Sequence, residues 1–167
     1  VLSPGARSAP LALAIAAEEK LARTIHFDER GAGFFALGIA RRLEAPVALV
    51  CTSGTAVANY FPAIVEASLT GTSLIVLTAD RPSRLRGTGA NQTIMQPNIF
   101  GEYAIISCDL HAAMTEQASD AAIRTTLQRA VNRPRGVVHL NCQFDEPLVD
   151  RNVSTAVDST TSRTTTS

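Results

Sequence analysis

The sequence lacks an excess of either charge, because 15 basic and 15 acidic residues give the 167-residue chain a formal net charge of zero. Lysine is almost absent, with Lys20 the only one, and no block of basic residues stands out. A surface that binds nucleic acid or an anionic membrane needs a cluster of positive charge. The composition therefore disfavours both partners, and any site for an anion must be local.

Long apolar runs and paired cysteines are also missing. No run approaches the roughly 18 apolar residues that span a bilayer, and no charged and then apolar leader precedes the first predicted helix. Cys51, Cys108 and Cys142 are widely spaced and form no CxxC pair. This usage is typical of a reduced, cytoplasmic chain with buried thiols. We therefore expect a cytoplasmic protein with no metal site among these residues.

Glycine-rich phosphate loops are absent as well. No GxGxxG segment follows a predicted strand and no Walker-type GK(S/T) segment occurs, which disfavours a nicotinamide or nucleoside triphosphate site. His26 and His139 lie within apolar segments and are more typical of buried than of catalytic histidines, and His111 follows a predicted strand without an obvious partner.

What the sequence does contain is 46% hydrophobic residues arranged in alternating segments. The predicted strands are apolar throughout, a pattern that indicates a mainly parallel sheet covered on both faces, in a three-layer α/β/α arrangement. Strands are predicted at residues 1–2, 24–28, 46–52, 73–78, 104–108 and 136–141, and helices at 9–22, 29–43, 55–69 (with a kink at Pro62), 94–103 (a short one within this range) and 116–131.

The chain ends indicate a piece of a longer protein. Val1 and Leu2 read as the last residues of a strand with no preceding methionine, so we expect the domain at residues 1–150 to lack its first strand or helix. Ten of the sixteen residues from Asn152 to Ser167 are serine or threonine. Residues 151–167 are therefore predicted to be a tail or linker.

Glu29 stands where the predicted strand at 24–28 meets a helix. A helix start stabilises an acidic side chain whether or not it does chemistry. In an α/β sheet, however, ligands bind beyond the carboxyl ends of the strands, where the loops at 3–8, 28–31 and 52–55 should converge. Glu29 is therefore a candidate catalytic residue. Gly54 would let backbone approach a ligand, although a plain strand-to-helix turn explains one glycine at least as well.

Two arginines and two amides follow the predicted strands. Arg7 and Arg81 on neighbouring loops would form a clamp for carboxylates, because guanidinium matches a carboxylate in bidentate geometry. An ion pair or cap with Asp80 is the alternative for Arg81. Asn91 and Gln92 would orient hydroxyl or carboxyl groups, or else satisfy loop backbone. Together these residues indicate an acidic substrate.

Five motifs carry a resemblance to a known family: SPGARS at 3–8, HFDER at 26–30, TSGTAVAN at 52–59, TADRP at 78–82 and GANQ at 89–92. In this order and spacing, from Val1 to about Pro147, the chain resembles the menaquinone-pathway family of 2-succinyl-5-enolpyruvyl-6-hydroxy-3-cyclohexene-1-carboxylate synthase. That family depends on thiamine diphosphate, and the part resembled is its amino-terminal pyrimidine-binding domain.

The resemblance implies a transferase that decarboxylates 2-oxoglutarate and adds the succinyl unit to isochorismate. It implies that Glu29 exchanges a proton with the aminopyrimidine ring of the cofactor, which needs a partly desolvated carboxyl group. The other residues that it implies are cofactor contacts at Pro4, Thr52, Ser53 and Gly54 and substrate contacts at Arg7, Arg81, Asn91 and Gln92.

Two departures from that family matter. Ala6 stands where much of the family has serine, so a hydroxyl contact is missing. The family's diphosphate-binding domain, which holds Mg²⁺ or Mn²⁺ through a Gly-Asp-Gly signature and a downstream Asn, is absent. We therefore expect an inactive fragment that needs such a domain from the same or a partner chain, in a homodimer or homotetramer. The alternatives are a carboligase of the acetolactate synthase type and a noncatalytic docking domain.

Overall fold

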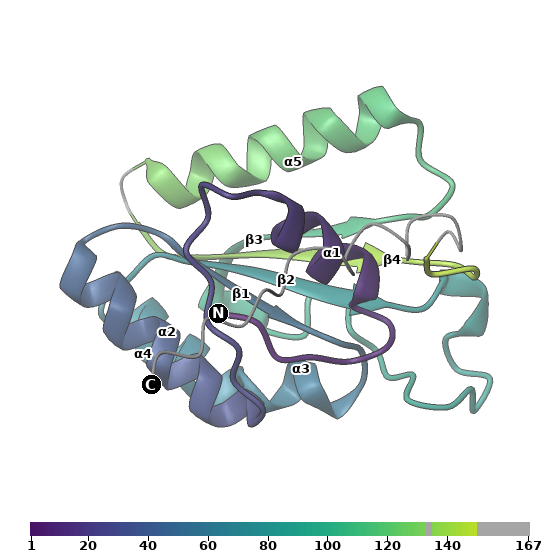
Figure 1. The fold of residues 1–167 in the computed structure, drawn as a ribbon, viewed down its shortest axis with the longest axis horizontal. Helices are drawn as coiled ribbons and strands as arrows, with labels where there is room; N and C mark the ends of the chain where they lie inside the picture. The colour runs from purple at the N-terminus through teal and green to yellow at the C-terminus, as the bar shows by residue number, and fades with distance from the viewer. Residues whose placement is uncertain (133–134, 150–167) are drawn as a thin grey trace, which may run out of the picture.

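The computed structural model describes residues 1–132 and 135–149, which form one four-stranded sheet with helices around it (Figure 1). All neighbouring strands are parallel, in the order β1-β2-β4-β3. None of the described helices is long and apolar enough to cross a membrane. In chain order the elements are α1 (Ala9–Ala17), α2 (Glu29–Leu43), β1 (Val47–Cys51), α3 (Thr55–Asn59), α4 (Phe61–Leu69), β2 (Leu74–Asp80), η1 (Ser83–Leu85), η2 (Gly101–Tyr103), β3 (Ala104–Leu110), α5 (Glu116–Val131) and β4 (Val137–Gln143).

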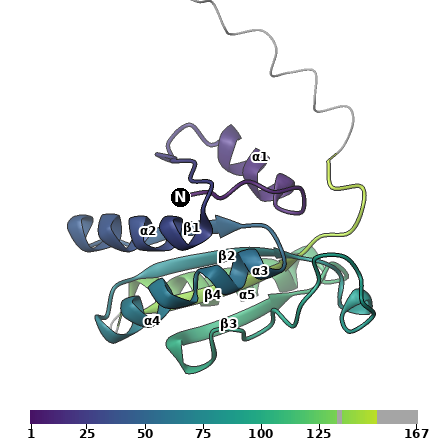
Figure 2. The same ribbon diagram turned by 90° about the horizontal axis from the view of Figure 1, so that it is seen from below.

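Helices cover both faces of this sheet. α2, α3 and α4 pack on one face and α5 packs on the other, against β3 and β4 (Figure 1). α1 lies on the β1 side of the sheet and has no buried residue (Figure 2). The predicted parallel, three-layer α/β/α class is confirmed, and its physical cause is the burial of whole strands: every residue of β4 is buried.

Small residues let α2 approach the rest of its layer closely. Ala32, Gly33, Ala36 and Ala40 recur at helical spacing and are buried. Gly33 lies so close to α4 that a Cβ atom built on it would be 2.8 Å from the Cβ of Ala63. This contact sets the distance between the two helices.

The sheet beyond β1 is less regular than the sequence predicts. Leu2 makes isolated parallel bridges to Ile25 and to Val50, so the predicted strands at 1–2 and 24–28 are reduced to single bridges. Ile25 is 61% exposed and Phe27 83% exposed. With no layer burying its side chains, this segment gains little from forming a full strand. The bridges still place residues 2, 25 and 50 side by side.

Several predicted helices are shorter or divided in the structure, and three predicted strands are longer. The helix predicted at 9–22 ends at Ala17, and the one predicted at 55–69 is two helices separated at Tyr60, with Pro62 in the first turn of α4 instead of at a kink. The short helix expected within 94–103 is only η2. Strands β2, β3 and β4 each run two residues further than predicted, to end on Asp80, Leu110 and Gln143.

Gly33 and Gly38 on the same helix form a matched pair for testing this packing. A Cβ on Gly38 would meet nothing within 4 Å, so Gly38→Ala should raise the free energy of unfolding by up to about 1 kcal/mol through helix propensity. Gly33→Ala should lower it by roughly 1 kcal/mol, because overpacking against Ala63 outweighs the same gain. Urea unfolding measures both, and equal changes would show that the α2–α4 contact does not limit packing.

Candidate functional site

The Glu29 carboxylate lies at the edge of the sheet where β1 ends. Glu29 is the first residue of α2 and is half-buried, while Asp28 caps the helix by accepting a hydrogen bond from the Gly31 N–H at 2.7 Å. Burial raises the pKa of the Cys51 thiol and of the Tyr60 hydroxyl, and the charge of Glu29 raises both further, so the carboxylate is near these groups. No hydrogen bond or ion pair within residues 1–132 and 135–149 uses it.

The loop after Leu2 runs beside this carboxylate. The Ser3 N–H donates to the Val50 carbonyl at 2.8 Å, and the Tyr60 hydroxyl donates to the same carbonyl at 2.9 Å. Gly5 lies against the Thr52 side chain and leaves no room for a Cβ atom. Pro4 is exposed and Thr52 is buried. The loops that carry Pro4, Glu29 and Thr52 therefore lie together at one edge.

Ser53, Arg81 and Gln92 form one hydrogen-bonded group, and Gln92 packs against Gly54. Arg81 Nη1 donates to Ser53 Oγ and, at 2.8 Å, to the Gln92 carbonyl, while Gln92 Nε2 donates to the Ser53 carbonyl at 2.9 Å. Gly54 has a φ of +82°, and a Cβ atom on it would be 2.7 Å from Gln92 Cγ. Glycine is thus required here for the approach of Gln92. Asn91 is exposed, and its side chain makes no hydrogen bond to another described residue.

Arg7 is 9% exposed and lies near Arg81. Its Nη1 donates to the Phe144 carbonyl at 3.0 Å and its Nη2 to Glu146 Oε1 at 3.2 Å. Burial, and then the charge of Arg7, lower the pKa of Arg81, so the two guanidinium groups repel each other electrostatically. The two arginines are thus coupled through their charges, while each is hydrogen-bonded to different groups of the chain.

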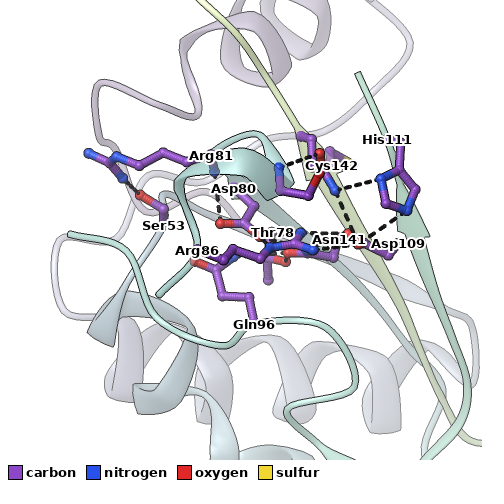
Figure 3. Close-up of polar contacts among 12 residues, drawn as sticks. Ser53, Thr78, Asp80, Arg81, Arg86, Gln96, Asp109, His111, Asn141 and Cys142 are labelled. Carbon is purple, nitrogen blue, oxygen red and sulfur yellow. Dashed lines mark hydrogen bonds and ion pairs between the residues drawn. The ribbon is translucent and has the colours of Figure 1, made fainter. Parts of the chain in front are cut away.

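Arg86, which the sequence analysis did not single out, carries the ion pairs of this region (Figure 3). It bridges two carboxylates, with Nη2 2.7 Å from Asp80 Oδ2 and Nη1 2.8 Å from Asp109 Oδ2. Asn141 Nδ2 donates to the same two carboxylates, at 2.9 and 2.8 Å. Asp80 accepts from the backbone N–H of Arg81 at 2.7 Å, so it caps Arg81 while its ion pair is with Arg86.

These polar groups share one face of the sheet. Side chains alternate between faces along a strand, and the parallel register pairs Thr78 with Asn141, Asp109 with Asn141 and Ser107 with His139. These residues form a polar row across the ends of three strands. In the sequence, the signal that could have revealed the row is the polar residue at every second position near the end of an otherwise apolar strand. The members of the row are Thr78 and Asp80 in β2, Ser107 and Asp109 in β3, and His139, Asn141 and Gln143 in β4.

Gln96 joins this row to the candidate site. It is fully buried, and its Oε1 accepts from the Gly54 N–H at 2.8 Å. Its Nε2 donates to the Ala79 carbonyl at 3.0 Å and to Asn141 Oδ1 at 2.9 Å. The turn at Gly54 is therefore held by the ends of β2 and β4, through a residue that no local sequence pattern distinguishes.

The chain is similar to known proteins in sequence and in fold. The family described as "Thiamine pyrophosphate enzyme, N-terminal TPP binding domain" matches residues 1–99. The chain is 50% identical over 160 residues to 2-succinyl-5-enolpyruvyl-6-hydroxy-3-cyclohexene-1-carboxylate synthase of Shewanella baltica (strain OS185), covering 93% of this chain and 27% of the relative. It is 52% identical over 151 residues to the protein of the same name in Shewanella oneidensis, covering 88% and 25%. The chain thus spans about a quarter of the length of these relatives.

A solved structure shows the same fold. The crystal structure of benzoylformate decarboxylase from Polynucleobacter necessarius superposes with a TM-score of 0.71 at 18% identity, covering 85% of this chain and 26% of that one.

His139 gives the folded chain a defined response to acid. Burial lowers its pKa from 6.5 to about 4, only partly offset by the charge of Asp109. Between these values the unfolded chain binds a proton that the folded chain does not, so the free energy of unfolding should fall as the pH drops from 6.5 to 4, by roughly 3 kcal/mol from this residue. Urea unfolding at several pH values measures how the free energy of unfolding changes with pH. This dependence should be weaker in His139→Gln and unchanged in the control His111→Gln, which alters an exposed histidine. Equal slopes in His139→Gln and the unaltered chain would refute this assignment.

Proposed function

The chain belongs to the family of N-terminal TPP-binding domains of thiamine pyrophosphate enzymes, and from that premise we propose that it is the pyrimidine-binding domain of a 2-succinyl-5-enolpyruvyl-6-hydroxy-3-cyclohexene-1-carboxylate synthase. Relatives of that name are about half identical to it over some nine-tenths of its length. The observation that carries the proposal is the half-buried carboxylate of Glu29, which has no partner among the described residues and lies at the edge where three loops meet.

The residues at this edge fit the pyrimidine ring of thiamine diphosphate. Glu29 offers a carboxylate that is not already paired within the described chain, and Thr52, Ser53 and Gly54 supply buried backbone beside it. Pro4 lies on the neighbouring loop, next to Gly5, which contacts the Thr52 side chain. When bound, thiamine diphosphate supplies the electron sink that stabilises a carbanion in decarboxylation and transfer.

Glu29 is the group at this edge that is suited to moving a proton. The Cys51 thiol and the Tyr60 hydroxyl beside it have pKa values raised by burial, so both stay neutral near pH 7. A carboxyl oxygen of Glu29 would hold the proton and return it to a ring nitrogen as a general acid and base. Aspartate, one methylene shorter, would not reach.

Arg7 and Arg81 are suited to the acidic substrates of such a synthase. The proposed substrates, 2-oxoglutarate and isochorismate, each carry two carboxylates, and the two neighbouring guanidinium groups offer a cation to each end of such a molecule. Gln92 uses its amide nitrogen on Ser53, which leaves its amide oxygen for a hydroxyl, and the exposed Asn91 is available for the same purpose. Pyruvate has a single carboxylate and would leave one of the two arginines unused. The arginine pair therefore favours this synthase over an enzyme of the acetolactate synthase type.

We propose that a diphosphate-binding domain of the same or a partner chain holds Mg²⁺ or Mn²⁺ and the diphosphate, that the enzyme is a homo-oligomer in the cytoplasm, and that residues 1–150 belong to its pyrimidine-binding domain. The predicted tail at 151–167 lies outside the described residues.

Glu29→Gln tests the proposal in the longer enzyme, or in this chain reconstituted with a diphosphate-binding domain. Glutamine has nearly the same shape but cannot exchange the proton, so turnover of 2-oxoglutarate with isochorismate should fall by roughly 10²-fold or more while the thermal unfolding midpoint stays unchanged.

Glu44→Gln at the exposed end of the same helix is the matched control and should leave turnover unaltered. Normal turnover in Glu29→Gln, or a preference for pyruvate over 2-oxoglutarate in the unaltered enzyme, would count against the proposed function.

A further inference from the structure

Arg7, one of the two arginines proposed to bind substrate carboxylates, is already paired with a carboxylate of the chain itself. Glu146 Oε1 is 3.2 Å from Arg7 Nη2, and the two side chains differ sharply in exposure, 73% for Glu146 and 10% for Arg7. Arg7 Nε is buried and has no hydrogen-bond partner among the described residues. The guanidinium group is thus fixed in the protein while its counterion lies in solvent.

Glu146 also acts on the second arginine of the clamp. Its charge raises the pKa of Arg81, against the larger lowering effects of burial and of Arg7. The preceding residue, Asp145, pairs with the exposed Arg84 at 2.7 Å and accepts a hydrogen bond from the Glu146 N–H at 2.9 Å. Of these two neighbouring acidic side chains, only Glu146 is bonded to the clamp.

The physical reason for this arrangement is the cost of an unpaired buried cation. Removing the partner of a buried charge is strongly destabilising, whereas an exposed ion pair contributes little. An exposed carboxylate can therefore keep Arg7 paired in the absence of ligand and still be displaced at small cost.

We propose that Glu146 is a displaceable counterion of the Arg7 and Arg81 site: its carboxylate occupies Arg7 until a ligand carboxylate replaces it, so Glu146 sets the affinity of the site for acids. This inference rests on the proposed role of the two arginines in holding a dicarboxylate. Glu146 is a specificity-determining residue here, because it competes with the ligand and takes no part in the chemical step.

Succinate titration of this 167-residue chain, followed by side-chain N–H signals of arginine in NMR spectra, tests the inference. Glu146→Gln keeps an oxygen acceptor for Arg7 but removes the charge, and should bind succinate about fivefold more tightly, as expected for loss of one weak competing ion pair. Asp145→Asn removes the same charge one residue away and should change the affinity by less than about twofold. Glu146→Asp, whose carboxylate is one methylene further from Arg7, should lie between the unaltered chain and Glu146→Gln.

An equal gain in succinate affinity in Glu146→Gln and Asp145→Asn would show a general charge effect and overturn the inference. Unchanged succinate affinity in Glu146→Gln would also overturn it, as would the absence of succinate binding by the unaltered chain and all variants. These readings do not involve the cofactor or Glu29. Failure here therefore leaves the turnover test of Glu29→Gln standing, and failure of that test leaves the comparison of Glu146→Gln with Asp145→Asn intact.

Discussion

The arrangement of the site depends on one largely buried cation, Arg86, between two carboxylates. Asp80 is the last residue of β2 and Asp109 lies one residue before the end of β3, on either side of β4, and without a cation the charges of these two carboxylates would repel each other in a poorly solvated place. Burial alone would raise the pKa of Asp109, but hydrogen bonds from Arg86, Asn141 and Gln143 outweigh it and hold that pKa below its usual value. Because Arg86 comes from the loop after β2, neutralising the carboxylates also holds that loop against the sheet.

The same loop carries the groups that shape one side of the candidate site. Gln96 fixes the Gly54 turn and Arg81 bonds to Ser53, so these parts are held by the chain's own hydrogen bonds before any ligand arrives. The other side differs: the Glu29 carboxylate has no partner among the described residues, and Arg7, which also donates to the Phe144 carbonyl, has the exposed Glu146 as its counterion. The candidate site thus combines a half held by hydrogen bonds with two charged groups, Glu29 and Arg7, which fits the proposed proton transfer and anion binding.

Local patterns in the sequence predicted some features well. The bounds of α2 follow from the Asp28 cap and the helical spacing of its small apolar residues, and the parallel sheet follows from strands that are apolar throughout. Prediction failed where tertiary contacts, and not the local sequence, decide whether a strand or helix forms. The segment around Ile25 has strand-like residues but no layer to bury them, and the helix break at Tyr60 coincides with a buried hydroxyl that bonds to Val50, which no local rule anticipates.

By itself, the sequence determined the fold class and predicted Glu29, Arg7 and Arg81 at one edge of the sheet, because strand ends in a parallel α/β sheet meet at the same edge whatever the details of packing. Only the tertiary structure decided which charges are paired. Arg86 lies 23 residues from Asp109 and Arg7 lies 139 residues from Glu146 along the chain. An ion pair across such separations depends on distances and burial in the folded state, which short-range sequence patterns do not contain.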